Sequence, residues 1–231
     1  MNKMKVIILA AGMGTRLGNL VPKPLTAISE EKSILDFQVE RISKVIDIND
    51  ILLIVGYEFQ KIMESHPDLT YVLNHDYATT GTAKSLLKAL IKVKDEDVLW
   101  MNGDVHFDEG ALEPILQCKT SCCLVNDNVC IDEEVRYNID EDGFIKELSK
   151  KVKDSRGEAL GINLVKAKDL ELFKKALEEV GDNDYFEKAI ENMIEKKLSN
   201  FMPILLVDSF CKEIDFPEDL AEVREYLATK D

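Results

Sequence analysis

Near the start of the chain, an apolar run is followed by a loop that contains two glycines. Two positively charged residues lie in this loop or just after it. The run and loop read ILAAGMGTRL at residues 8–17, and KPL follows at residues 23–25. Glycines let backbone N–H groups approach a polyphosphate closely, while Arg16 and Lys23 would supply positive charge where a leaving phosphate becomes negative. Flanking prolines hold Lys23 more firmly than an ordinary solvated loop requires. These residues predict a phosphate-binding loop in which Arg16 and Lys23 are catalytic.

Two other glycine-rich loops fit the pattern less well. A dinucleotide-binding fingerprint requires a third glycine where this chain has Leu17. A P-loop requires Gly-Lys-Ser/Thr after four intervening residues, and the sequence has no such segment here. An exposed loop without function remains the alternative for Arg16 and Lys23.

Strand-length apolar runs alternate with helical spacing through the first half of the chain. The apolar runs are residues 5–10, 51–55, 71–73 and 98–101. Helical spacing of apolar residues recurs at residues 34–46 and 82–93. This alternation indicates βαβ units on a parallel sheet, which binds ligands at the carboxyl ends of its strands.

The second half of the chain begins with a hairpin pattern. Residues 135–140 and 144–148 flank a Glu-Asp-Gly turn, which predicts an antiparallel pair. Further elements are expected at residues 159–165, 170–180, 185–196, 204–207 and 212–214, and in a last helix from Pro217. We therefore predict an α/β fold with a Rossmann-like, doubly wound, mixed and mainly parallel sheet and an antiparallel hairpin or lid in its C-terminal half.

We expect a single domain over residues 1–231. Its residues 1–130 would bind a nucleotide, and residues 131–231 would bind an acceptor and form the lid. This length suits one large α/β domain, and 45% of the residues are hydrophobic, which is enough for one core.

The composition excludes several classes of partner. A net charge of −15 argues against binding to nucleic acid or to an anionic membrane, and no apolar run approaches the ~18 residues of a membrane span. Five cysteines fit no paired disulfide framework and indicate a reducing cytosol. A zinc site at Cys118, Cys122, Cys123 and Cys130 is the alternative to ordinary buried thiols. We expect a cytoplasmic monomer or homodimer.

The segments LAAGxGTRL and KPL together resemble the signature of the nucleotidyltransferases that make activated sugars and alcohols. This family includes glucose-1-phosphate thymidylyltransferase and the small phosphocholine cytidylyltransferases, and the resemblance extends over the whole chain. It implies that the glycine loop wraps the triphosphate of an NTP and that Arg16 and Lys23 act at the phosphates. It also implies that two acidic groups hold Mg²⁺, with Mn²⁺ as a substitute.

The resemblance suggests Asp104 and Asp215 as the two metal ligands. Asp104 follows the fourth apolar run, at the strand end where a sheet of this kind binds its ligand. Asp215 lies at the junction between the last extended segment and the last helix, and we prefer it to Glu213 and Asp208 for that reason. A helix cap or turn is the alternative for Asp104. Carboxylate oxygens suit Mg²⁺, which would neutralise phosphate oxygens.

The resemblance also indicates where the nucleotide binds. Small and hydroxyl-bearing residues before the helix at residues 82–93 would frame a base, and a plain helix cap is the alternative at Thr80 or Thr82. The expected nucleotide-binding residues are Leu9, Ala10, Ala11, Gly12, Met13, Gly14, Thr15, Gly56, Tyr57, Asn74, Thr80, Gly81, Thr82, Ser85 and Gly103. Cytidine is the expected base, because the chain most resembles the cytidylyltransferases of this family.

The acceptor site is less clearly marked in the sequence. A choline pocket requires aromatic faces, for which Tyr137, Phe144, Tyr185 and Phe186 are available without forming a dense cluster. Basic residues gather instead after the hairpin and would suit an acceptor that carries a carboxylate, although a solvated basic turn is an equal alternative. The candidate acceptor-binding residues are Lys150, Lys151, Lys153, Glu158 and Asp184, with Glu187 as a further acidic candidate.

The chain also resembles cytidylyltransferases that act on phosphoglutamine in capsule biosynthesis. The resemblance therefore implies CTP as the nucleotide and L-glutamine phosphate as the acceptor, with release of pyrophosphate. The acceptor phosphate would attack directly, because it is already anionic and needs no enzyme nucleophile. Phosphocholine or a sugar 1-phosphate is the alternative acceptor. The alternative outside enzymes is a nucleotide-sensing module that keeps the loop without the chemistry.

Overall fold

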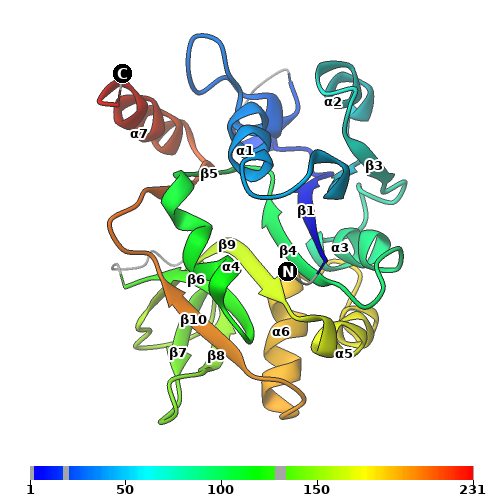
Figure 1. Cartoon of the computed structure of the whole chain (residues 1–231), viewed down its shortest axis with the longest axis vertical. Helices are drawn as coiled ribbons and strands as arrows, with labels where there is room; N and C mark the ends of the chain where they lie inside the picture. The colour runs from blue at the N-terminus through cyan, green and yellow to red at the C-terminus, as the bar shows by residue number, and fades with distance from the viewer. Residues whose placement is uncertain (1–2, 18–20, 128–133, 231) are drawn as a thin grey trace.

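A mixed sheet forms the centre of the molecule (Figure 1). The computed structural model describes residues 3–17, 21–127 and 134–230, and within this part of the chain the sheet has nine strands. The strands of the chain are β1 (Met4–Ala10), β2 (Ile51–Val55), β3 (Thr70–Leu73), β4 (Asp97–Asn102), β5 (Val105–Phe107), β6 (Ser121–Asn126), β7 (Arg136–Ile139), β8 (Ile145–Ser149), β9 (Gly157–Val165), β10 (Phe201–Leu205) and β11 (Cys211–Glu213). The remaining two, β5 and β11, pair with each other in a small separate sheet.

The strand order of the main sheet is β10-β6-β9-β4-β1-β2-β3. Four of these six neighbouring pairs are parallel, and β9 runs antiparallel to both β4 and β6. The predicted hairpin forms as β7 and β8, and β7 also pairs with β9. The expected mixed, mainly parallel sheet with an antiparallel hairpin in the C-terminal half is confirmed.

Helices cover both faces of the sheet. They are α1 (Ile34–Ser43), α2 (Phe59–Ser65), α3 (Thr82–Leu90), α4 (Glu113–Gln117), α5 (Ala167–Glu179), α6 (Phe186–Glu195) and α7 (Pro217–Ala228). Alternate residues of β1 point to opposite layers, as strand geometry requires. Ile7 and Leu9 pack in the cluster with α3, α5 and α6, whereas Val6, Ile8 and Ala10 pack with α1, α2 and α4. The sheet is therefore doubly wound, as predicted.

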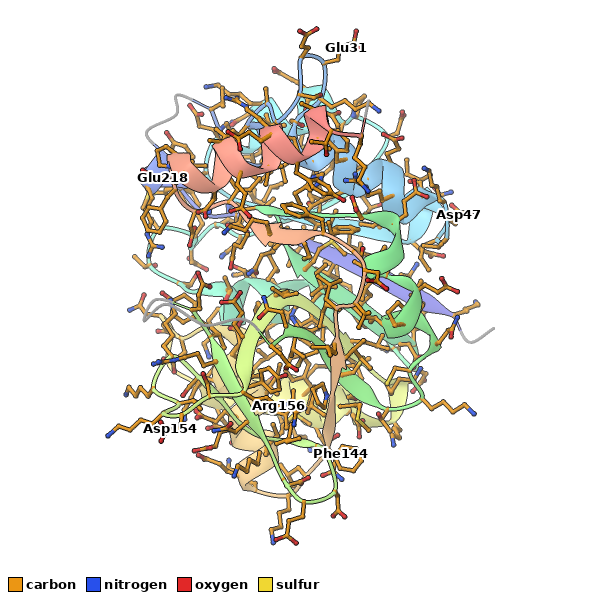
Figure 2. The ribbon with its side chains drawn as sticks, turned by 90° about the vertical axis from the view of Figure 1, so that its left-hand side faces the viewer. Glu31, Asp47, Phe144, Asp154, Arg156 and Glu218 are labelled. Carbon is orange, nitrogen blue, oxygen red and sulfur yellow. The ribbon has the colours of Figure 1, made fainter. Side chains whose placement is uncertain are left out.

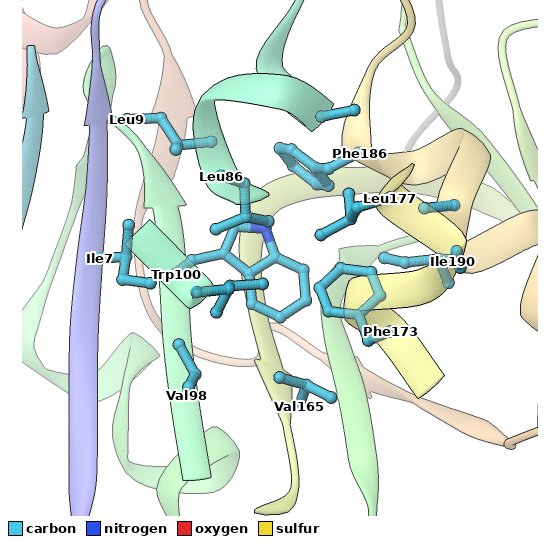
Figure 3. Packing of buried hydrophobic residues seen from close by; sticks show 14 of the residues in the cluster. Ile7, Leu9, Leu86, Val98, Trp100, Val165, Phe173, Leu177, Phe186 and Ile190 are labelled. Atoms are coloured by element: carbon cyan, nitrogen blue, oxygen red, sulfur yellow. The ribbon is translucent and has the colours of Figure 1, made fainter. Parts of the chain in front are cut away.

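The core beneath α5 and α6 is centred on Trp100 of β4, the only tryptophan in the sequence (Figure 3). Its ring stacks on Phe173 of α5 with 5.0 Å between ring centroids. Phe186, the first residue of α6, meets Trp100 edge-on at 5.6 Å. All three side chains are buried. This cluster fixes the start of α6 against the sheet.

Most of the expected elements form within a few residues of their predicted limits. The largest shift along the chain is in β10, predicted at residues 204–207, which ends at Leu205. This edge strand is only half-buried and contains Pro203, so its apolar pattern is weak. Strands β5 and β6 and helices α2 and α4 were not part of the expected set, and all four are short, with three to seven residues each.

The described cysteines, Cys118, Cys122, Cys123 and Cys211, are free thiols, and Cys130 lies outside the described residues. In residues 3–17, 21–127 and 134–230, no group of three or more His, Cys, Asp or Glu side chains could hold a metal ion.

No helix of the described chain is long and apolar enough to cross a membrane. Figure 2 shows Phe144, at the hairpin, and Glu31, in the loop before α1, at opposite ends of the molecule. The division into two functional halves at residue 130 stays a prediction.

Replacing Phe173 by alanine should lower the free energy of unfolding by about 3–5 kcal/mol, because the aromatic stack on Trp100 would become a cavity. Urea unfolding followed by the fluorescence of Trp100 measures this change. Leu198→Ala is the control, because Leu198 is 44% exposed and its loss should cost less than about 1 kcal/mol. Equal effects of the two substitutions would contradict this account of the core.

Candidate functional site

A cleft of about 320 Å³ opens at the carboxyl ends of β1 and β4, where parallel strands of such sheets bind ligands. Its walls come from both halves of the chain, including the glycine loop, the end of β4, the start of α6 and the segment after β11. The cleft therefore brings together segments that are far apart in the sequence.

The glycine loop lines one side of the cleft through Gly12 and Gly14. Gly14 has a φ of +59°, and a Cβ atom at this position would lie 2.7 Å from Cβ of Lys23. Gly103 is constrained in a similar way, because its N–H donates to the carbonyl of Leu9 at 2.9 Å and a Cβ would lie 2.7 Å from that oxygen. Both positions therefore require glycine on steric grounds.

Lys23 connects the two aspartates that the resemblance suggested as metal ligands. Its Nζ donates to Oδ2 of Asp104 at 2.6 Å and to Oδ1 of Asp215 at 2.5 Å. Burial alone lowers the pKa of Lys23, but the two carboxylates outweigh it and the pKa lies above its usual value. Lys23 begins a short 3-10 turn (Lys23–Leu25) directly after Pro22, which holds the backbone in place. It is therefore a fixed and fully charged cation.

Arg16 lies at the exposed rim of the same cluster. It belongs to the 3-10 turn Thr15–Leu17, and its guanidinium donates to Oδ2 of Asp215 at 3.1 Å. About half of its side chain is exposed, and it lies 5.8 Å from the centre of the Phe216 ring. Arg16 can therefore reach a ligand in the cleft while it contacts Asp215.

The small sheet of β5 and β11 explains how residues 104 and 215 meet. Asp104 directly precedes β5, and the antiparallel pairing places Glu213 of β11 opposite Val105. The N–H of Ile214 donates to the carbonyl of Asp104 at 3.0 Å, which extends this pairing to the aspartate. Asp219, in the first turn of α7, accepts from the N–H of Asp215 at 3.0 Å. Backbone hydrogen bonds therefore fix both aspartates.

A third acid, Glu213, lies beside the pair and lines the cleft. Burial and then the charges of Asp104 and Asp215 raise its pKa well above the usual value. Its Oε1 accepts from Nδ2 of Asn102 at 3.0 Å. The sequence analysis preferred Asp215 to Glu213, and both are in the cleft, whereas Asp208 lines another cavity. The spacing of two residues on an extended segment is the signal that would have predicted Glu213 beside Asp215.

The expected nucleotide-binding residues form two groups. Leu9, Ala10, Gly12, Gly14, Thr82 and Gly103 line the cleft. The others are not among the residues that line it. Of these, Asn74 is buried and donates to the hydroxyls of Thr80 and Ser85 at 3.0 Å each. The N–H of Tyr57, next to Gly56, donates to the carbonyl of Ala11 at 3.1 Å. Met13 is 48% exposed, Thr15 begins its 3-10 turn, and the N–H of Gly81 donates to the carbonyl of Asp182.

The candidate acceptor residues do not all line one cavity. Lys150 lines both the cleft and a neighbouring groove, whereas Lys151 and Asp184 line only the groove. Asp184 accepts from the N–H of Gly181 at 2.7 Å, and Glu158 accepts from Nδ2 of Asn126 at 2.7 Å. Lys153 lines neither cavity, and its carbonyl accepts from Nδ2 of Asn138 at 3.4 Å.

Four further residues line the cleft, and the sequence analysis did not select them as a group. They are Glu134, Tyr185, Phe186 and Glu187. Tyr185 and Phe186 had been weighed only for a choline pocket, and Glu187 only as a further acid. Glu134 had no signal in the sequence, because its place depends on how β7 packs against β9.

Comparison with known proteins supports the resemblance of the loop motif to nucleotidyltransferases. The guanylyltransferase of Campylobacter jejuni that acts on D-glycero-alpha-D-manno-heptose 1-phosphate is 28% identical over 163 residues, which cover 67% of this chain and 72% of that protein. The choline-phosphate cytidylyltransferase of Streptococcus pneumoniae is 39% identical over 89 residues, which cover 36% of this chain and 38% of that protein.

A solved structure of the CTP:phosphocholine cytidylyltransferase from Streptococcus pneumoniae has the same fold. It superposes with a TM-score of 0.79 at 22% identity, and covers 97% of this chain and 99% of that one. Residues 6–135 match the family model of the MobA-like NTP transferase domain. Because this match covers more than half of the 231 residues, the chain belongs to the nucleotidyltransferases with a MobA-like NTP transferase domain.

Proposed function

We propose that this nucleotidyltransferase moves CMP from CTP to the phosphate of a small molecule and releases pyrophosphate. The observation that carries the proposal is the meeting of Lys23, Asp104 and Asp215 in the cleft beside the glycine loop. In the reaction, an oxygen of the acceptor phosphate forms a bond to the α-phosphorus of CTP. The bond from that phosphorus to the β-phosphate oxygen breaks, and pyrophosphate leaves with the electron pair.

The residues of the cleft suit each part of this reaction. Backbone N–H groups of the loop at Gly12 and Gly14 would hold the triphosphate, since a flexible glycine turn forms a cradle for anions. Lys23 and Arg16 would stabilise the negative charge that develops on the leaving pyrophosphate. The acceptor phosphate is itself anionic at neutral pH, so the chain needs only to position it in line with the bond that breaks.

Mg²⁺ is the proposed cofactor, and Asp104 and Asp215 would hold it. Oδ1 of Asp104 is buried and makes no hydrogen bond within the described part of the chain. Magnesium is commonly bound by one or two carboxylates together with substrate phosphates, so two aspartates without a third described protein ligand fit this ion. When bound, the ion would neutralise negative charge on the phosphates, and Mn²⁺ would substitute.

The choice of CTP and of the acceptor rests on resemblance. The relatives include a cytidylyltransferase and a guanylyltransferase. The preference of this chain among nucleoside triphosphates is therefore the first specificity to measure. We propose L-glutamine phosphate, for modification of a capsule, as the acceptor, with phosphocholine or a sugar 1-phosphate as the alternative. The described geometry favours the transfer chemistry itself, because the chain supplies both cations and both carboxylates for it.

Pyrophosphate release tests the proposed function directly. The protein would be incubated with Mg²⁺, with each of CTP, UTP, GTP, ATP and dTTP, and with each of glutamine phosphate, phosphocholine and glucose 1-phosphate. We expect the fastest release with CTP, and release that requires an acceptor. Tight binding of CTP without pyrophosphate from any acceptor would instead indicate a nucleotide-sensing module.

Lys23→Met should lower kcat by roughly 10²–10³-fold, because it removes a fixed charge that would stabilise the leaving pyrophosphate. Lys32→Met is the matched control, since Lys32 is 43% exposed and pairs with Glu40 outside the cleft. Pyrophosphate release at saturating substrates measures the effect. If Lys23→Met retains the rate of the Lys32 control, Lys23 has no role in the chemistry.

Asp104→Asn should raise the Mg²⁺ concentration needed for half-maximal activity by about tenfold or more, because one anionic ligand is lost. Titration of Mn²⁺ into the protein with bound CTP, followed by calorimetry, measures the same change without turnover. Asp142→Asn is the control, because Asp142 lies at the exposed tip of the hairpin. An unchanged metal affinity in Asp104→Asn would assign the ion to other ligands.

A further inference from the structure

A buried amide holds both ends of the turn that carries Asp104. Gln38 is in the middle of α1, is 1% exposed and does not line the cleft. Its Nε2 donates to the carbonyl of Asn102 at 2.9 Å and to the carbonyl of Val105 at 2.8 Å. Asn102 ends β4, and Val105 begins β5. One side chain from a separate helix therefore fixes both ends of the turn between these strands.

The two residues between these carbonyls are held through their backbone as well. The N–H of Gly103 donates to the carbonyl of Leu9 at 2.9 Å, and the carbonyl of Asp104 accepts from the N–H of Ile214 at 3.0 Å. Oδ1 of Asp104 has no hydrogen bond of its own within the described residues. The direction in which this oxygen points therefore depends on the backbone of the turn, to which Gln38 makes two hydrogen bonds.

The other polar atom of the Gln38 amide has no such partner. Oε1 of Gln38 is buried and makes no hydrogen bond within the described part of the chain. An unpaired buried oxygen costs free energy, so an apolar side chain would serve packing alone better. The NH₂ group, in contrast, is neutral and has two hydrogens, so it can bond two carbonyls at once. The two bonds to the turn therefore account for a glutamine at this position.

The same helix is tied to the turn that carries Lys23. The N–H of Ile34, the first residue of α1, donates to the carbonyl of Thr26 at 3.1 Å. The N–H of Thr26 in turn donates to the carbonyl of Lys23 at 3.0 Å. α1 thus contacts the backbone on both sides of the ion pair between Lys23 and Asp104, at one side through Gln38.

We infer that Gln38 is a positioning residue for the metal ligand Asp104, and that it acts through the two carbonyls of the turn without contacting the substrate. The inference rests on the proposed function, which assigns Asp104 to Mg²⁺. Because Nδ2 of Asn102 donates to Glu213 at 3.0 Å, a shift of the turn would also move this third acid. Residues that orient a metal ligand from behind commonly change metal affinity by about 10–100-fold when they are replaced.

Gln38→Met tests the inference, because it keeps an unbranched side chain of similar size and removes both donors. Mn²⁺ would be titrated into the protein, alone and with CTP, and free Mn²⁺ would be measured by electron paramagnetic resonance. We expect the Kd for Mn²⁺ to rise by about tenfold or more. The Mg²⁺ concentration needed for half-maximal pyrophosphate release should rise by a similar factor. KM for the acceptor should stay within about twofold, because Gln38 contacts no substrate.

Ile42→Val is the control for a loss of stability without a change at the turn. Ile42 is buried one turn further along α1 and has no polar side-chain atom. Thermal unfolding gives the stability of each variant, and we expect this control to bind Mn²⁺ within about twofold of the unsubstituted protein. Gln38→Glu is a second variant, of the same shape. Its carboxylate would face two carbonyl oxygens, so its Kd for Mn²⁺ should rise at least as far, and it provides the readout if Gln38→Met is misfolded.

Three results would overturn the inference. They are an Mn²⁺ affinity of Gln38→Met within about twofold of the unsubstituted protein, an equal loss of affinity in Ile42→Val, or no binding of Mn²⁺ to the unsubstituted protein with or without CTP. Failure of the proposed function has a different result: the loss of Mn²⁺ affinity in Gln38→Met would persist, while no combination of nucleotide and acceptor released pyrophosphate.

Discussion

The repulsion between carboxylates in one cleft is the constraint on which the site depends. Asp104, Asp215 and Glu213 share a partly buried space in a chain whose net charge is already −15. Lys23 relieves this repulsion through two short ion pairs. Its position follows from Gly14, where a side chain would collide with it, and from the turn that Pro22 begins. The loop motif thus serves the folded state of the cleft as well as the proposed binding of a phosphate.

The pairing of β5 with β11 is the structural answer to the same constraint. Acids that repel one another must be held by something other than their side chains, and here backbone hydrogen bonds do this across more than a hundred residues. The cap that Asp219 forms at α7 adds a second backbone anchor beside Asp215. The aspartates are therefore preorganised, which limits the reorganisation that charge stabilisation requires during a reaction.

The sequence predicted the fold and the residues that meet around Lys23 better than those near the start of α6, for a physical reason. Strands such as β2 are buried on both faces, so their apolar runs match their limits, and the loop motif is contiguous. The part of the cleft near Lys150 is assembled from the segment before β7, the turn after β8 and the start of α6. Lys150 could be selected by its charge, but nothing in the sequence separates it from Lys151, which lines only the neighbouring groove, or joins it to Glu134.

This difference suggests how one fold serves several acceptors. A relative at 22% identity superposes over nearly the whole chain, so the sheet and the strand ends tolerate extensive substitution. At the start of α6 and in the turn after β8, the charge of a few side chains can change while the strands that hold Asp104 and the glycine loop stay in place. That freedom is limited at α6, because Phe186 is part of the core around Trp100 while its neighbour Glu187 lines the cleft. Substitutions that move α6 therefore alter stability and the position of the Glu187 carboxylate together.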